Sequence, residues 1–242
     1  SFSQKSSRLV QYKADSILAA DTLFKDDAVH FKIGKNIRDI WTKGFYWDLG
    51  GNYITSGNYQ GDYFAFGNFS YVFNQDKKIS FEFSNSIHSL PLLYSVYSSN
   101  HFLWDKKNYY NKVSKTGLQL CYYDSKNKFS VGGKLNQINY YVYFDSTFSP
   151  TQFDSTLYIY SAFIQKNFRL KKFHFNNKIT WQQASKDVIH LPEFITHHSL
   201  YYEDKWFKKV MDVQIGFDVT YFSSYYADAY MPALGQYYWQ DE

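Results

Sequence analysis

The chain has 242 residues, 22% of them aromatic, with a mean hydropathy of -0.49. It has no long apolar run, which excludes a helical membrane protein, because each spanning helix needs about 20 consecutive apolar residues. The net charge is +4, from 26 basic and 22 acidic residues, and the basic residues do not cluster with glycine as they do in nucleic-acid-binding arms, so we expect no nucleic-acid partner. Cys121 is the single cysteine, which excludes an intrachain disulfide, and we predict no redox role for it.

The abundant tyrosine and tryptophan are typical of surfaces that are apolar at one end and wet at the other, as at a membrane interface. An aromatic-rich soluble β protein, such as a glycan binder, has a similar composition. We expect one domain over residues 1–242, because β-barrels exceed the usual domain size. The choice between the two classes therefore depends on the pattern of the strands.

In chain order, residues 1–27 show no sustained period and are predicted to be mostly loop, with a strand near 9–12. Strands are then predicted wherever apolar and polar residues alternate or aromatic residues are dense. They are 29–33, 44–56, 62–73, 79–88, 116–122, 129–136, 157–168, 173–182, 194–202 and 211–222. The remaining long stretches are predicted to be loops: 90–110, 145–156, 184–193 and 223–242.

The stretch 211–222 shows the clearest alternation. Apolar residues occupy every second position from Met211 to Tyr221, and polar residues or glycine stand between them from Asp212 to Thr220. This is the period of a strand with one apolar and one wet face. A half-buried strand of a soluble sandwich alternates too, so a single stretch does not separate lipid from a protein core.

The lengths of the connections alternate along the chain. Short ones are predicted at 74–78, 124–128, 169–172 and 203–209, and longer ones at 90–110, 145–156, 184–193 and after 222. Transmembrane β-barrels have short turns at one end and long loops at the other. In lipid every backbone amide needs a partner within the protein, so without long helices only a closed sheet spans. We therefore predict an all-β, antiparallel up-and-down transmembrane β-barrel, with 223–242 as an extracellular loop.

The polar rows of these strands are the best candidates for a functional surface. The charged residues predicted to line a pore are Glu82, Lys134, His174, Lys178, Asp212 and Asp218. Mixed signs argue against strong ion selectivity. The alternative is that these groups form salt bridges that pack a narrow barrel. Aromatic residues of 90–110 have three open roles: stacking on sugars, anchoring at the interface, or forming a core within the loop.

No catalytic or metal-binding arrangement stands out, and we predict that the protein is not an enzyme. His197 and His198 are adjacent, and neighbours on a strand point to opposite faces, so they cannot chelate one ion together. No two carboxylates are distinguished as a glycosidase pair. Gly132 and Gly133 lie mid-strand without a following helix, so a bulge or close packing explains them better than a phosphate loop.

The segment 225–238, YYADAYMPALGQYY, resembles a recurring segment of the putative porin family of Bacteroidota. The preceding hairpin, 194–222, resembles the strand pair that the family places before it, so the resemblance is strongest over 194–238. It implies a β-barrel in the bacterial outer membrane. Outer-membrane barrels characteristically finish on a strand ending in an aromatic residue, whereas this sequence ends at Gln240, Asp241 and Glu242 within a predicted loop. We therefore expect an incomplete portion of a larger barrel.

The expected function is passive diffusion of small solutes across an outer membrane, without a cofactor. A ring of about ten strands is too narrow for this, because aqueous channels appear near 16 strands, so further strands are required. Expected partners are outer-membrane lipid, small solutes and other outer-membrane subunits. The alternative is a structural barrel subunit of a larger outer-membrane complex. A plugged active transporter would need an N-terminal plug, which we do not recognise in this sequence.

Overall fold

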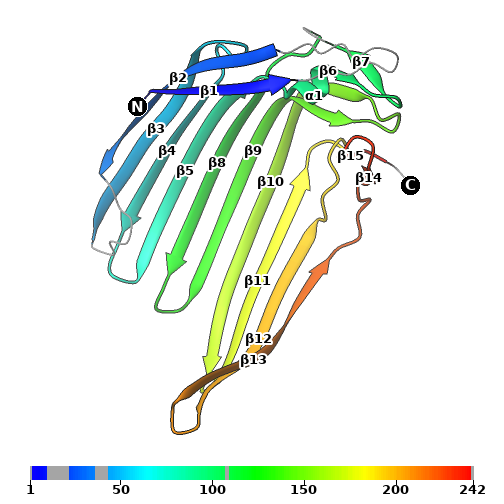
Figure 1. The fold of residues 1–242 in the computed structure, drawn as a ribbon. Coiled ribbons are helices and arrows are strands. Elements are labelled where there is room, and N and C mark those ends of the chain that lie inside the picture. The colour runs from blue at the N-terminus through cyan, green and yellow to red at the C-terminus, as the bar shows by residue number, and fades with distance from the viewer. Residues whose placement is uncertain (1, 10–21, 36–42, 107–108, 241–242) are drawn as a thin grey trace.

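The computed structural model describes residues 2–9, 22–35, 43–106 and 109–240 (Figure 1). One antiparallel sheet contains β1 (Phe2–Leu9), β2 (Thr22–Lys35), β3 (Gly44–Ser56), β4 (Tyr63–Val72), β5 (Lys77–His88), β8 (Val113–Asp124), β9 (Phe129–Phe144), β10 (Pro150–Leu170), β11 (Phe173–Ala184), β12 (Phe194–Trp206) and β13 (Met211–Phe222). The smaller elements are α1 (Leu92–Ser95), β6 (Val96–Ser98), β7 (Leu103–Asp105), β14 (Ala229–Met231) and β15 (Gln236–Tyr238). None of the helical segments described is long and apolar enough to cross a membrane.

The eleven strands pair in the order in which they follow one another along the chain, which makes the sheet an up-and-down meander. The all-β, antiparallel, up-and-down part of the prediction is confirmed. The sheet is open over the described residues, because β1 pairs only with β2 and β13 only with β12. A closed ring is therefore not formed by this part of the chain.

One face of the sheet, which we call the apolar face, is apolar across many strands. A single cross-strand row on it runs from β3 to β11 through Phe45, Tyr71, Ile79, Tyr122, Val131, Ile164 and Ile179. Residues directly opposite one another on paired strands share a face. Alternation along each strand places the next residue on the other face.

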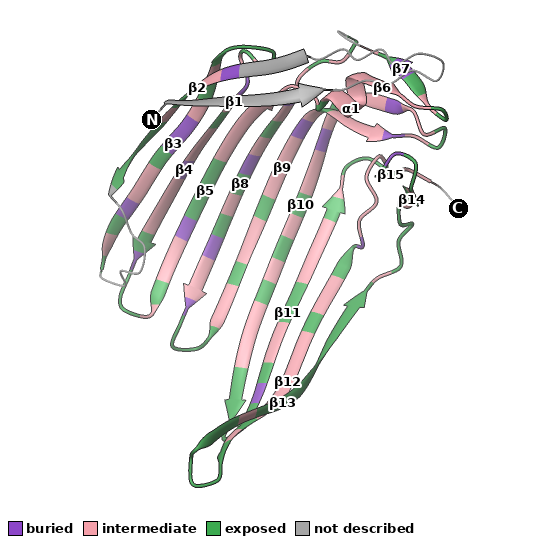
Figure 2. Cartoon of the chain, in the orientation of Figure 1, coloured by how far each residue is buried: buried purple, intermediate pink, exposed green. Residues whose placement is uncertain are grey.

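No second layer formed by the described residues covers the apolar face. Phe81, Phe173, Ile215 and Phe217 are 39–62% exposed, whereas a sandwich would enclose them. Figure 1 shows a single curved sheet, and Figure 2 shows exposed residues recurring along its strands. A soluble sandwich is therefore not the architecture of the described residues.

The two ends of the sheet differ. The connections at one end are 73–76, 125–128, 171–172 and 207–210, and those at the other are 57–62, 89–112, 145–149, 185–193 and 223–240. α1, β6 and β7 lie in 89–112, and the hairpin of β14 and β15 follows β13 (Figure 1). The predicted long connections are confirmed at 89–112 and 185–193, whereas 145–149 is far shorter than the predicted loop 145–156. We call the second end the loop end.

The loop end has its own apolar core. Trp104, Phe144 and Leu234 are buried together, from 89–112, β9 and the segment after β13. Around them pack Leu93, Tyr94, Tyr97, Phe102, Phe148, Met231 and Tyr238. Of the three roles left open for the loop aromatics, a core within the loops is therefore the one that Tyr94, Tyr97, Phe102 and Trp104 fill. Tyr109 is 74% exposed and lies outside this core.

Several predicted boundaries are wrong. Residues 2–9 and 22–35 are strands, so 1–27 is not mostly loop, and most of the strand predicted at 9–12 lies outside the described residues. Strand β10 already begins at Pro150, where the first position of a strand tolerates a missing N–H, and a register shift between Phe153 and Thr156 hid its period. The loop predicted at 223–242 contains β14 and β15.

Candidate pore-lining face

The residues predicted to line a pore share the face opposite the apolar one, which we call the polar face. Its central row crosses the same strands, β3 to β11, through Asp48, Asn68, Glu82, Gln119, Lys134, Ser161 and Gln182. Lys178 lies opposite Gln165, four residues beyond Ser161 on β10, so it is on this face too. His174 lies four residues before Lys178 on β11, so it is on the polar face as well. Asp218 pairs with Ser199, and Asp212 lies six residues before Asp218 on β13, which places both on the same face.

The polar face is the more enclosed side of the sheet. Tyr46, Val72, Ser80 and Cys121 lie on it and are at most 7% exposed. Towards the loop end, Val188 and Ile189 of 185–193 pack against the buried Ile138 and Leu157 of β9 and β10. Connections at this end thus fold back over the polar face.

Several of the charged residues on this face have partners within the protein. The Asp212 carboxylate lies 3.1 Å from Lys205 Nζ, and Asp218 accepts a hydrogen bond from the Ser199 hydroxyl. Lys178 Nζ lies 5.4 Å from the centre of the Phe163 ring. These contacts favour the packing interpretation for part of the face.

His174 is held by stacking rather than by a well-formed hydrogen bond. Its ring is parallel to that of Tyr201, with the centroids 4.5 Å apart. Its Nε2 lies 3.1 Å from a Glu203 carboxylate oxygen, yet the approach lacks hydrogen-bond geometry and Nε2 has no hydrogen-bond partner. The contact with Glu203 is therefore electrostatic, and stacking on Tyr201 holds the His174 ring.

Glu82 and Lys134 differ from Asp48, the third charged residue of the central row. The Asp48 carboxylate oxygen Oδ2 lies 3.6 Å from Lys32 Nζ and accepts a hydrogen bond from Asn68 Nδ2 at 3.3 Å. Over the part of the chain that the structure describes, neither Glu82 nor Lys134 forms an ion pair or a hydrogen bond. Both side chains are exposed and carry charges of opposite sign on the polar face.

A comparison with protein families decides the family of this chain. The model of the family described as "Putative porin" matches residues 3–242. The chain belongs to the putative porin family. The match confirms the family resemblance of 194–238 and extends it to almost the whole sequence. A search of curated proteins finds no match.

Porins are typically not enzymes, and the described residues of this porin-family chain hold no group of three or more His, Cys, Asp and Glu side chains able to bind a metal ion. His197 Nδ1 lies 3.0 Å from Thr220 Oγ1, and His198 Nδ1 lies 2.7 Å from Asn177 Oδ1. These partners lie on the polar and apolar faces respectively, so the prediction that the two imidazoles point to opposite faces is confirmed.

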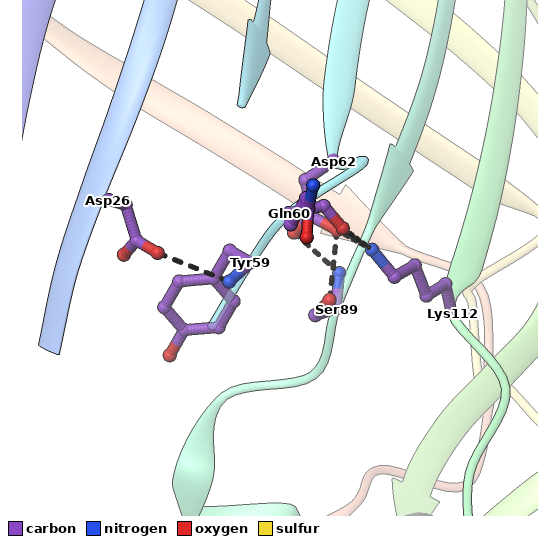
Figure 3. Close-up of polar contacts among 6 residues, drawn as sticks. All are labelled: Asp26, Tyr59, Gln60, Asp62, Ser89 and Lys112. Carbon is purple, nitrogen blue, oxygen red and sulfur yellow. Dashed lines mark hydrogen bonds and ion pairs between the residues drawn. The ribbon is translucent and has the colours of Figure 1, made fainter. Parts of the chain in front are cut away.

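A polar cluster at the loop end, which we call the clasp, escaped the sequence analysis (Figure 3). Asp62 is 7% exposed and accepts hydrogen bonds from the Ser89 backbone N–H at 2.7 Å and the Ser89 hydroxyl at 2.8 Å. Lys112 Nζ donates to Asp62 Oδ1 at 2.7 Å and to the Gln60 carbonyl at 2.6 Å. The clasp ties both ends of 89–112 to the connection between β3 and β4. Residues so far apart in sequence carry no local signal of their pairing.

Asp26 extends the clasp towards β2. Its Oδ1 accepts a hydrogen bond from the Tyr59 backbone N–H at 3.2 Å. Burial, and then the negative charges of Asp26 and Asp62, raise the pKa of Tyr59, so its phenol stays protonated at neutral pH. The network thus joins β2, the connection between β3 and β4, and 89–112.

We expect Asp62→Ala to lower the free energy of unfolding by about 1–3 kcal/mol, because it removes the buried acceptor of the Ser89 N–H and the charged partner of Lys112, which keeps only the Gln60 carbonyl. Equilibrium unfolding in detergent, with limited proteolysis of 89–112, checks this. The control is Asp187→Ala, which removes an exposed acid whose side chain forms no hydrogen bond or ion pair with the described residues. Equal unfolding energies for the two variants would contradict the role of the clasp.

The short connection 145–149 is organised by one carboxylate. Asp145 accepts hydrogen bonds from Thr147 N at 2.9 Å, Thr147 Oγ1 at 2.6 Å, Ser149 N at 3.1 Å and Thr151 Oγ1 at 2.8 Å. Burial on its own raises the pKa of Asp145, but these hydrogen bonds outweigh it and the pKa is lowered. The turn is therefore built around the ionised carboxylate.

Proposed function

We propose that this member of the putative porin family spans an outer membrane through its sheet and allows passive diffusion of small solutes along the polar face. The observation that carries the proposal is the pair of rows that cross β3 to β11. One row is apolar and faces outward without a covering layer, and the other is polar and charged. Such a sheet fits hydrocarbon on one side and water on the other.

Membrane insertion requires partners for the free edges of the sheet. An unpaired backbone N–H or C=O costs several kcal/mol in hydrocarbon, so open edges are not stable in a bilayer. Nearly all residues of β13 are exposed, and among the described strands it pairs only with β12. We infer that in the membrane the edges of β1 and β13 are paired, and that the resulting ring encloses the polar face.

The mixture of charges on the polar face supports weak ion selectivity. Glu82, Asp212 and Asp218 supply negative charge, and Lys134 and Lys178 supply positive charge. Charges of both signs along a water-filled passage leave little preference for either ion. The expected current is therefore ohmic and nearly unselective.

The second candidate is a structural barrel subunit without transport of its own. The pairs of Lys205 with Asp212 and of Asp218 with Ser199 favour it, because they fill part of the polar face with internal contacts. A side-chain-filled lumen would carry no solute. The exposed Glu82 and Lys134, which have no ion pair or hydrogen bond among the described residues, favour transport.

Single-channel recording of the full-length protein in planar bilayers tests the proposal. We expect stepwise conductance with a reversal potential close to zero in a salt gradient. Lys178→Glu is expected to move the reversal potential towards cation selectivity by more than Lys186→Glu, which makes the same charge change in the connection 185–193. Absence of any ionic current from folded, inserted protein would favour the structural subunit instead.

A further inference from the structure

We propose that a hollow on the polar face, between Glu82 and Lys134, binds a short zwitterionic peptide. The inference rests on the proposed function, since it names the class of solute that this face selects. The positive end of the solute faces the Glu82 carboxylate and its negative end faces the Lys134 ammonium. The solute lies across the strands rather than along them.

The hollow has a volume of about 270 Å³ and spans β4, β5, β8 and β9. Its polar walls come from Asn68, Glu82, Ser84, Gln119 and Lys134, and its apolar wall comes from Phe64 and Phe66. Gly117 forms part of the floor, where a Cβ atom would lie 2.7 Å from the Ser84 hydroxyl. The missing side chain therefore contributes to the depth of the hollow.

The two charged groups of the hollow, Glu82 and Lys134, lie on either side of Gln119. Register places Gln119 directly between Glu82 and Lys134 in one cross-strand row. Neither charged group has an ion pair or hydrogen bond among the described residues, although other charges of the face, such as Asp48 and Asp212, do. A solute that carries both signs satisfies the two groups at once.

The volume of the hollow limits the size of the solute. Neighbouring strands lie about 4.8 Å apart, so the Cα atoms of Glu82 and Lys134 are separated by about 10 Å. Because the charged atoms lie at the ends of flexible side chains, the volume of the hollow, about 270 Å³, limits a solute that bridges them to a small molecule with one charge at each end. A dipeptide carries its α-ammonium and α-carboxylate on two Cα atoms about 3.8 Å apart, so it is the smallest peptide with a charge at each end.

The remaining lining groups fit the body of a dipeptide. The Asn68 and Gln119 side-chain amides each carry donors and an acceptor, which match a peptide group. The centroids of the Phe64 and Phe66 rings lie 5.8 Å apart, with 30° between the ring planes, and Phe64 is exposed. They provide an apolar surface for a side chain of the solute.

Titration calorimetry on the detergent-solubilised full-length protein, with alanyl-phenylalanine as the probe, tests the inference without requiring conduction. We expect saturable binding that is lost when the probe is N-acetylated or C-amidated. Glu82→Gln and Lys134→Gln should each weaken binding at least about tenfold, because each removes one charge-assisted hydrogen bond. The matched controls Asp154→Asn and Lys186→Gln remove the same charges outside the hollow and should bind as the unmodified protein does.

Equal binding of the capped and uncapped peptides, or no binding at all, would overturn the inference. The double variant Glu82→Lys with Lys134→Glu tests whether weaker binding by the single variants comes from misfolding. It keeps both charges but exchanges their positions, so the peptide binds in the reversed orientation. It should bind more tightly than either single variant, and weaker binding would refute the charge pairing. A conducting channel without peptide binding removes only this inference, whereas binding without ionic current removes only the transport proposal.

Discussion

Arginine at position 164 is expected to destabilise the membrane-inserted protein far more than arginine at position 165. Ile164 lies on the apolar face, 45% exposed, between Val131 and Ile179 on the neighbouring strands. Gln165, its neighbour in β10, pairs with Ser130 and Lys178 on the polar face. A charge on the lipid face of a β-barrel costs about 2–4 kcal/mol near the bilayer midplane, whereas a residue facing the lumen stays solvated.

Urea unfolding of both variants in lipid vesicles, with the shift in electrophoretic mobility on heating as a second probe, measures this difference. Gln165→Arg is the matched control, because it adds the same side chain one residue away on the same strand. We expect Ile164→Arg to unfold at much lower urea and to insert poorly. Similar unfolding energies for the two variants would show that Ile164 does not meet lipid, and would undermine the assignment of the faces.

A methyl group is expected to be costly at Gly132 and tolerated at Gly133. A Cβ atom on Gly132 would lie 2.6 Å from Cys121 Sγ, 2.7 Å from Phe163 and 2.9 Å from the Leu120 carbonyl oxygen. The backbone oxygen cannot rotate away, so the sheet must shift. Overpacking of this kind costs about 1–3 kcal/mol.

Gly133 is the control within the same strand. Its nearest contact for a Cβ atom is 3.7 Å, from the Ser161 carbonyl oxygen, which is ordinary van der Waals contact. Gly133→Ala should therefore change the free energy of unfolding by less than about 1 kcal/mol, and in the stabilising direction, because alanine has fewer unfolded conformations to lose. Equilibrium unfolding in detergent compares the two, and equal losses would contradict the packing seen at Gly132.

The structure distinguishes between the two explanations that the sequence leaves open for Gly132 and Gly133. The paired glycines predict either a bulge or a close approach of neighbouring groups. The register of β9 with β8 and β10 is continuous through both residues, and the close contacts belong to Gly132 alone. Periodicity could not separate the two explanations, because the contact is made by Cys121 and Phe163 on other strands.

Strands whose side chains alternate strictly were predicted well. The stretch 211–222 coincides with β13, and 79–88 and 173–182 lie within β5 and β11. Where a bulge interrupts the period, as between Phe153 and Thr156, the prediction placed a loop on what is strand. Side-chain alternation therefore predicts a strand where the pleat is regular and misses the strand at a bulge.

The assignment of charged residues to one face was also accessible from the sequence, whereas their partners were not. A strand places every second residue on the same side, so Glu82 and Lys134 could be assigned to the polar row from their own strands alone. That Gln119 stands between them, and that Asp212 pairs with Lys205, depends on register. Register is decided by turns and cross-strand packing, and periodicity does not encode it directly.

From the order of its residues alone, the protein is determined to be an antiparallel meander with one apolar and one polar face, short turns at one end and longer connections at the other. These properties are local, since each follows from the alternation of neighbouring side chains and from the residues that interrupt it. Only the tertiary structure decided that Trp104, Phe144 and Leu234 form a core at the loop end, that Asp62 clasps Lys112, and that a hollow lies beside Glu82. These features join residues distant in sequence, and their contacts exist only once the strands are in register.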